Sequence, residues 1–263
     1  MIGRGGSMDE KLEQIKEYWN QRIHDMEMTE HALGTLGFFN DLEAYRYEKL
    51  NYLPGVVNFE SFSGKKVLEI GCGIGTDLVR FARGGAIVTG VDLSETAVDL
   101  AVKNFRLHNL EADLRVGNGE SLEFPDNTFD AVYAHGVLQY TADITRMIHE
   151  SFRVLKSGGV FIGMLYNRKG WLNAMSSLFK VDLEHDDAPV FNLYTQQEFK
   201  KFLGLFHEVS IVPERFPVKS RLQKGWKAFF FNTVFVGFFN LIPRAWVRQW
   251  GWHLMGFGVK NDA

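Results

Sequence analysis

Short apolar runs alternate with stretches of helical periodicity over the middle of the chain. Runs rich in β-branched residues, typical of buried strands, occupy residues 67–70, 86–91, 114–116, 129–134 and 160–166. Between them, apolar residues recur every three or four positions, which is the pattern of helices that pack on one side. One of these helices is expected to be capped by Thr141 and to stop at residues 157–159. Strands that alternate with helices predict a parallel sheet with helices on both faces. The sequence therefore predicts an α/β protein with a doubly wound sheet.

The first quarter of the chain predicts helices only. Residues 9–31 carry apolar residues at helical spacing, and 38–50 form a second helix that Pro54–Gly55 interrupts. A helical pair before a nucleotide-binding unit often serves as a lid, so residues 8–63 are expected to close over a site. The alternative is that they only cover one face of the sheet. Residues 1–7 resemble the remnant of an expression tag and are set aside.

The last third of the chain has a looser pattern. Thr195 and Glu198 form a capping box, which predicts a helix over residues 196–206. Two further strands are expected at 209–212 and 253–259.

Composition and charge narrow the class of protein. The chain has 263 residues, of which 46% are hydrophobic and 23% charged, as expected for a globular protein. Its net charge of −3 gives no electrostatic case for binding nucleic acid. The single cysteine, Cys72, forms no disulfide within the chain, which suits a reducing compartment and predicts a cytoplasmic location. No signal peptide and no uninterrupted apolar run near 18 residues is present.

A glycine-rich loop ends the first predicted strand. Gly71, Gly73 and Gly75 alternate with other residues, and a helix begins at Thr76. Glycine permits positive φ and removes the Cβ atoms that would hold a ligand away. A strand, glycine loop and helix in this order direct backbone N–H groups at a polar or anionic ligand. Asp92 ends the second strand about 20 residues past the first glycine, where an acidic residue meets ribose hydroxyls in such units.

Four motifs in order carry a resemblance to a known family. They are Glu69–Gly75, Val91–Ser94, Gly117–Glu120 followed by Phe124–Asp130, and Arg153–Gly159. Together they resemble the class I S-adenosylmethionine-dependent methyltransferases, which are Rossmann-like. The nearest group includes the ubiquinone and menaquinone C-methyltransferases and many small-molecule methyltransferases. The resemblance covers about residues 65–168.

The resemblance implies a fold and a division of the chain. The sheet would have seven mostly parallel strands, with the final strand, residues 253–259, antiparallel. Residues 64–168 would bind S-adenosylmethionine, and residues 169–263 would hold an acceptor-side insertion and the C-terminal strands.

The resemblance also implies a cofactor site. The glycine loop would approach the methionine part of the cofactor, Asp92 would bind the ribose hydroxyls, and Leu93 would pack on the adenine. Asn118–Gly119 stands where the family usually has an Asp-Ala pair at the adenine edge, and Asn can still accept that role. Tyr18 and Arg46 would close over the methionine carboxylate, or else be solvated helix positions. The expected cofactor-binding residues are Tyr18, Arg46, Glu69, Gly71, Cys72, Gly73, Gly75, Asp92, Leu93, Asn118, Gly119, Glu120, Ala134 and His135.

Three residues at strand ends are candidates for catalysis. His135 is either a general base or a group that orients the cofactor. Tyr140 and Tyr166 either bind the acceptor or the cofactor carboxylate, or only wall the pocket. Many relatives have two histidines where this chain has Gln139–Tyr140, so no base is carried over from them. Residues 184–187 (Glu-His-Asp-Asp) are metal-ligand types without a partner motif, and no metal is expected.

An apolar segment, residues 226–242, stands apart from the rest. It carries six phenylalanines and is flanked by basic residues and tryptophans. Three interpretations stay open: a wall or lid of the acceptor pocket, a segment that contacts a membrane surface, and a homodimer contact. The first two favour a lipophilic or aromatic acceptor.

The sequence therefore predicts a methyltransferase that uses S-adenosylmethionine to methylate a small hydrophobic or aromatic molecule. One alternative is a nicotinamide-dependent oxidoreductase, which shares the glycine loop and Asp92 but fits Asn118–Gly119 and residues 156–159 poorly. The other is a protein that binds S-adenosylmethionine without catalysis.

Overall fold

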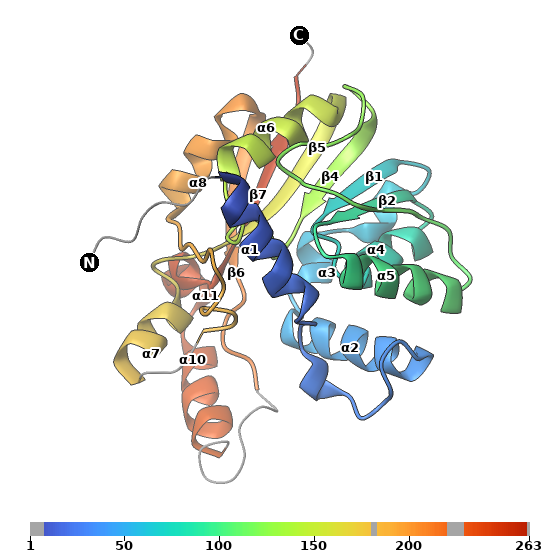
Figure 1. Cartoon of the computed structure of the whole chain (residues 1–263). Coiled ribbons are helices and arrows are strands. Elements are labelled where there is room, and N and C mark those ends of the chain that lie inside the picture. Colours follow the sequence, from blue (N-terminus) through green and yellow to red (C-terminus); the bar gives the residue numbers. More distant parts are fainter. Residues whose placement is uncertain (1–7, 180–182, 220–228, 262–263) are drawn as a thin grey trace.

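A seven-stranded sheet runs through the centre of the molecule (Figure 1), in a computed structural model that describes residues 8–179, 183–219 and 229–261. The strand order is β3-β2-β1-β4-β5-β7-β6. β1 to β5 are parallel, and only β7 runs against its neighbours, β5 and β6. The strands are β1 Lys66–Ile70, β2 Ile87–Asp92, β3 Asp113–Val116, β4 Phe129–Ala134, β5 Leu155–Tyr166, β6 His207–Glu214 and β7 His253–Val259. This confirms the predicted sheet, including its antiparallel final strand.

Helices cover both faces of the sheet, and alternate residues of each strand point to opposite faces. In β1, Val67 packs with Leu78 and Phe81 of α4, whereas Leu68 packs with the side chains of α6 and α8. The helices are α1 Met8–Asn20, α2 Leu36–Lys49, α3 Leu53–Val56, α4 Thr76–Arg83, α5 Glu95–Leu107, α6 Ile144–Val154, α7 Trp171–Phe179, α8 Gln196–Phe202, α10 Val236–Leu241 and α11 Arg244–Val247.

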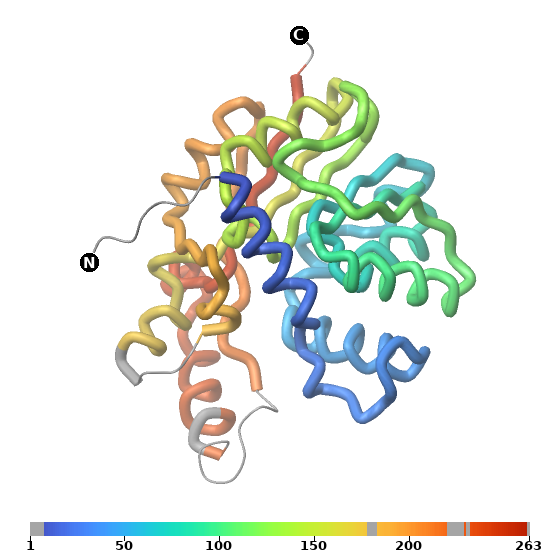
Figure 2. The backbone as a smooth tube through the Cα atoms, in the orientation of Figure 1, coloured from blue at the N-terminus to red at the C-terminus, as the bar shows by residue number. Residues whose placement is uncertain are grey.

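The N-terminal region departs from its predicted pattern. The first helix ends at Asn20 instead of continuing to His31, and Asp25 takes a left-handed conformation with φ of 59°. The turn brings residues 22–25 back toward the sheet, where they line a pocket. Pro54–Gly55 lies inside the short helix α3, because proline is tolerated in the first turn of a helix. In Figure 2, α1 crosses the middle of the molecule between β1–β3 and the C-terminal elements.

The boundaries of α6 also differ from the prediction. Asp143 caps the helix instead of Thr141, since its side chain accepts a hydrogen bond from the Arg146 N–H. The Thr141 hydroxyl donates instead to the buried Glu120 carboxylate. The helix then ends at Val154, and β5 begins at the next residue instead of after a turn at 157–159. The capping box of Thr195 and Glu198 is confirmed.

The apolar segment is only partly described. Residues 226–228 lie outside the described residues, while Phe230–Phe235 forms a π-helix that leads into α10. α10 lies at the opposite end of the molecule from α6 (Figure 1). Within the described ranges, no helix is long and apolar enough to cross a membrane.

Candidate active site

The glycine loop between β1 and α4 has the geometry that the sequence predicts. Gly71, Gly73 and Gly75 have φ of 70°, 52° and 78°, a region that glycine adopts without strain. A Cβ at Gly71 would lie 2.6 Å from Val137 Cβ, so a larger residue would displace the segment after β4. A Cβ at Gly73 would meet no atom within 4 Å, and this residue lines the pocket. The loop is therefore open to a ligand at Gly73.

Asp92, at the end of β2, fixes the loop that follows it and the glycine loop at once. Its Oδ2 accepts the Gly73 N–H at 2.8 Å, and its Oδ1 accepts the Ser94 N–H at 2.9 Å. Burial raises the pKa of Asp92, while the two N–H groups oppose that shift. Asp92, Leu93 and Ser94 all line the pocket, as expected for a ribose and adenine site.

The loop after β3 lies at the same edge of the pocket. Gly117, Gly119 and Glu120 line it, and the Asn118 side chain turns into its own loop, where Oδ1 accepts the Glu120 N–H at 2.8 Å. A Cβ at Gly119 would collide with Ile70 Cγ2. The backbone of this loop, more than the Asn118 side-chain amide, therefore faces the pocket where the adenine edge is expected.

Glu69 gives the pocket a buried carboxyl group that is only partly hydrogen-bonded. It lies in β1, lines the pocket, and its Oε2 has no hydrogen-bond partner among the described residues. Burial raises the pKa of Glu69 well above its usual value, because the charged form has lost its water. A bound cation would offset that loss. The open glycine cradle, the pre-organised Asp92 and this carboxyl group fit a cofactor with a ribose and positive charges.

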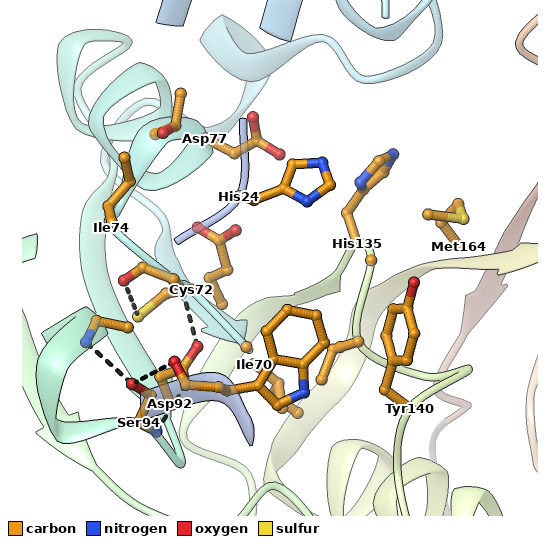
Figure 3. Close-up of a pocket in the computed structure, with 18 of the residues that line it drawn as sticks. His24, Ile70, Cys72, Ile74, Asp77, Asp92, Ser94, His135, Tyr140 and Met164 are labelled. Carbon is orange, nitrogen blue, oxygen red and sulfur yellow. Dashed lines mark hydrogen bonds between the residues drawn. The ribbon is translucent and has the colours of Figure 1, made fainter. Parts of the chain in front are cut away.

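The pocket has a volume of about 230 Å³ and continues from the cofactor side into a polar chamber. Figure 3 shows Asp92 and Ser94 on one side, with His24, His135 and Tyr140 across from them. The chamber is lined by His24, Asp25, Lys49, His135, Tyr140, Tyr166, Glu184, His185, Arg215 and His253. Its side chains come from the N-terminal helices, the strand ends and residues 184–185.

His135 is held at both ring nitrogens. Its Nδ1 lies 3.2 Å from an Arg46 guanidinium nitrogen, and its Nε2 lies 3.2 Å from the Tyr52 hydroxyl. Because a guanidinium only donates, Nδ1 is the acceptor and Nε2 carries the proton. Burial, with a smaller contribution from Arg46, lowers the pKa of His135 to about 3. This favours the predicted orienting role over the role of general base.

Arg46 and Tyr18, expected to close over the methionine carboxylate of the cofactor, both bind carboxylates of the protein. Arg46 makes a bidentate ion pair with Asp77, and the Tyr133 hydroxyl donates to the same carboxylate at 2.8 Å. Arg46 still lines the pocket. The Tyr18 hydroxyl donates to Asp187 at 2.5 Å, and Tyr18 is not among the residues that line the pocket. Sequence reasoning missed Asp77, which carried no signal beyond its place in the first turn of α4.

Tyr140 and Tyr166 form an aromatic wall. The Tyr140 hydroxyl donates to the Glu184 carbonyl at 3.1 Å, and its ring meets the Trp19 ring edge-on with centroids 5.1 Å apart. Tyr166 stacks on Trp252 with centroids 4.7 Å apart. Burial raises the pKa of Tyr166 to about 12, so its hydroxyl stays protonated. Ala134 is buried at the end of β4, and Cys72 is buried with its thiol pKa raised by burial.

The acceptor-side ion pairs were not predicted. Arg215 pairs with Glu184 at 2.7 Å and donates to His253 Nε2 at 3.0 Å, and Lys49 donates to both Asp25 oxygens. Glu184 therefore has a protein partner. In the part of the chain that is described, no group of three or more His, Cys, Asp or Glu side chains could hold a metal ion.

Known proteins resemble this chain over the part that carries the glycine loop and Asp92. Residues 68–163 match the family model described as a methyltransferase domain. A ubiquinone biosynthesis O-methyltransferase of Bartonella tribocorum is 33% identical over 132 residues, which are 49% of this chain and 53% of that protein. A sterol 24-C-methyltransferase of Aspergillus fumigatus is 37% identical over 103 residues, 37% of this chain and 27% of that protein. The chain thus spans about half, or less, of the curated relatives it matches.

Solved structures share the fold over almost the whole chain. Magnesium protoporphyrin IX methyltransferase of Synechocystis, solved with bound S-adenosylhomocysteine, has a TM-score of 0.61 at 14% identity, over 94% of this chain and 98% of its own. Geranyl diphosphate C-methyltransferase of Streptomyces coelicolor has a TM-score of 0.57 at 19% identity, over 96% and 98%. Residues 68–163 therefore match a methyltransferase domain, and the fold over almost the whole chain is shared with these solved methyltransferases.

Proposed function

We propose that the whole protein transfers the methyl group of S-adenosylmethionine to a small aromatic acceptor that carries a hydroxyl group. The observation that carries this proposal is the chamber next to the cofactor side. It combines aromatic walls, Trp19, Tyr140 and Tyr166, with buried polar groups such as His135 and His253. Aromatic walls favour a planar acceptor, and the polar side chains beside them favour one that also carries a polar group.

The cofactor supplies an electrophilic methyl group and leaves as a neutral thioether, so the protein has no departing anion to stabilise. The residues of this chain position the reactants. Asp92 and the glycine loop would hold the adenosyl part, and the Glu69 carboxyl group would face its positive charge. Trp19 and Tyr140 would fix the plane of the acceptor and keep water out. Such positioning contributes about 7–11 kcal/mol to lowering a barrier.

A transfer assay with methyl-labelled cofactor tests this function. We expect label in the product when catechol is the acceptor, and none when the apolar hydrocarbon naphthalene replaces it. Binding of S-adenosylhomocysteine without any methylated product from catechol or a metabolite extract would instead indicate a non-catalytic binding protein. Binding of NADH in place of S-adenosylhomocysteine would indicate an oxidoreductase.

We also propose that residues 229–250 contact the surface of an anionic membrane. Large apolar side chains are exposed there: Leu241 is 81% exposed, Trp246 75% and Phe238 66%. Arg244 and Arg248 lie among them, and basic residues beside exposed aromatic side chains suit an interfacial contact with acidic lipid headgroups. A lipophilic acceptor would be collected at such a surface. A cytoplasmic location stays a prediction from the single cysteine.

Vesicle sedimentation tests this contact. The protein should sediment with vesicles that contain phosphatidylserine and less with pure phosphatidylcholine, and Trp246→Ser should weaken sedimentation. The matched control is Leu107→Ser, an exposed apolar residue at the end of α5. If the protein is instead a dimer that Trp246→Ser dissociates, without affinity for either vesicle, the surface is a homodimer contact.

A further inference from the structure

A row of hydrogen bonds leads from the acceptor chamber to the protein surface. Lys49 Nζ lies 3.1 Å from His24 Nε2, and His24 Nδ1 lies 2.6 Å from His185 Nε2. His185 Nδ1 then lies 3.2 Å from the Tyr18 hydroxyl, which donates to Asp187 Oδ1 at 2.5 Å. These residues come from α1, the turn after it, α2 and the segment before α8. None of them belongs to the methyltransferase domain at residues 68–163.

The chemistry at the two ends fixes the direction of every bond in this row. The Asp187 carboxylate only accepts, so the Tyr18 proton points to it and the Tyr18 oxygen must accept from His185 Nδ1–H. A neutral His185 then has a bare Nε2, which accepts from His24 Nδ1–H. His24 Nε2 is bare in turn, and the Lys49 ammonium, which can only donate, faces it. All the donors point outward, from the chamber to Asp187.

The two ends of the row differ in their surroundings. His24 lines the pocket, and Figure 3 shows its ring directed into the pocket near His135. Tyr18 is buried in the middle, whereas the Asp187 side chain is 58% exposed. The charged groups around His24 are Lys49, Asp25 and Glu184. The row therefore runs from the pocket, where the His24 side chain is 36% exposed, to a carboxylate at the surface.

We propose that His24, His185, Tyr18 and Asp187 form a proton relay that removes the acceptor's hydroxyl proton during methyl transfer. The proposal rests on the proposed function, because only a protic acceptor releases a proton. The acceptor oxygen forms a bond to the methyl carbon as the carbon–sulfur bond breaks, and sulfur keeps that electron pair. The hydroxyl proton binds His24 Nε2, the Nδ1 proton moves to His185 Nε2, and the His185 Nδ1 proton moves to Tyr18. The Tyr18 proton moves to Asp187, which releases it to water.

His24 suits the entry point because its Nε2 is free of a proton between turnovers. Burial, followed by the charge of Lys49, lowers the pKa of His24 to about 4, so the ring is neutral at pH near 7. Lys49 also donates to Asp25 at 2.8 and 2.6 Å, so it keeps a partner when the acceptor takes its place at His24. An oxygen that bears both a proton and a new methyl group is a strong acid, so a weakly basic imidazole is sufficient.

The tautomers of the two histidines test the relay without any acceptor. In the full-length protein labelled with ¹⁵N-histidine, NMR should place the proton of His24 and of His185 on Nδ1. Tyr18→Phe should remove the constraint on His185. A proton on Nε2 of either ring would overturn the proposal, since the row would then be broken or reversed. This result does not depend on cofactor binding or turnover, so it separates failure of the relay from failure of the proposed function.

Turnover of two probes provides the second test. Catechol must lose a proton, whereas benzenethiolate enters without one. Tyr18→Phe and Asp187→Asn should each lower kcat for catechol about tenfold or more, with KM for S-adenosylmethionine and the benzenethiolate rate unchanged. The control Lys16→Met removes only the exposed ion pair with Glu95 on the same helix and should leave both rates unchanged. Equal losses for both probes, or no loss for catechol, would overturn the relay.

Discussion

Two arginines determine the protonation of two histidines at the strand ends. Arg46 faces His135 Nδ1 and Arg215 faces His253 Nε2, and neither guanidinium can accept a hydrogen bond. The other nitrogen of each ring therefore carries the proton and donates to the Tyr52 hydroxyl, at 3.2 and 2.6 Å. Both rings are buried and neutral, and a proton added to either would have no acceptor within this arrangement.

This arrangement predicts that stability falls in mild acid. The pKa of His135 is lowered to about 3 and that of His24 to about 4, both chiefly by burial, while unfolded histidines titrate near about 6.5. Between these values the unfolded chain binds protons that the folded protein does not. The free energy of unfolding should therefore be fully developed above about pH 6.5 and fall as the pH drops toward 4.

Urea unfolding at a series of pH values measures this dependence. His135→Gln removes one of the titrating rings, so its free energy of unfolding should fall less steeply with pH than that of the unsubstituted protein. A stability that is level from pH 7 to 4 would contradict the neutral, buried state of these histidines.

Asp92 gives a residue-level prediction for the cofactor. Asp92→Ala should weaken binding of S-adenosylhomocysteine by about 1–3 kcal/mol, because a charged acceptor for the ribose hydroxyls is lost. Isothermal titration measures the change. Asp113→Ala, which removes an exposed carboxylate of β3 that pairs with Arg115, is the control and should bind normally. Unchanged affinity in a folded Asp92→Ala protein would remove Asp92 from the site.

At the scale of elements, three ion pairs connect α2 with α4, namely Arg46–Asp77, Glu43–Arg80 and Glu43–Arg83, and they differ in burial. Arg46–Asp77 is almost enclosed, whereas Glu43–Arg83 lies at the surface. Arg46→Met should lower the free energy of unfolding by about 3–5 kcal/mol, because the Asp77 carboxylate would stay buried without its counter-ion. Arg83→Met, the matched control, should cost at most about 1 kcal/mol. Similar losses in the two variants, measured by urea unfolding, would contradict this difference.

Most strands and caps could be predicted because their signals are local. The apolar run at β1, the glycines after it and the capping box at Thr195 each depend on residues a few positions apart. The start of α6 could not be predicted in the same way. Thr141 and Asp143 are both good capping residues, and the choice between them depends on the buried Glu120, which is distant in sequence. Contacts with a residue distant in sequence therefore determined the cap of α6, where two nearby residues were equally suitable.

The candidate site also has one side that could be predicted from local sequence signals and one side that could not. Its cofactor side follows motifs of fixed spacing, so Asp92 and the glycine loop could be found from the sequence. Its acceptor side unites His24 and Lys49 from the first third of the chain with Arg215 and His253 from the last third, and these residues share no motif. Only the folded chain brings them together. The roles of the predicted catalytic residues, His135, Tyr140 and Tyr166, stay predictions.

At the scale of the whole molecule, the N-terminal helices and residues 184–187 enclose the pocket from the side opposite the strand ends. Lys16 of α1 pairs with Glu95 of α5, and Arg22, in the turn after α1, pairs with Asp187, so the N-terminal region is tied to α5 and to the segment before α8. A ligand held between these parts stabilises all of them together. S-adenosylmethionine at about 100 times its Kd should add about 2.7 kcal/mol to the free energy of unfolding and raise Tm. A thermal shift assay measures this, and an unchanged Tm at saturation would contradict binding in this pocket.

The position of β7 has a consequence for how the protein is made. β7 is the last strand to be synthesised, yet it lies between β5 and β6 and pairs with both. Until residues 253–259 leave the ribosome, β5 has an open edge and β6 has no neighbouring strand to join. Such edges pair readily with other chains. We therefore expect the nascent chain to be more prone to pair with other chains before this strand is made than after it.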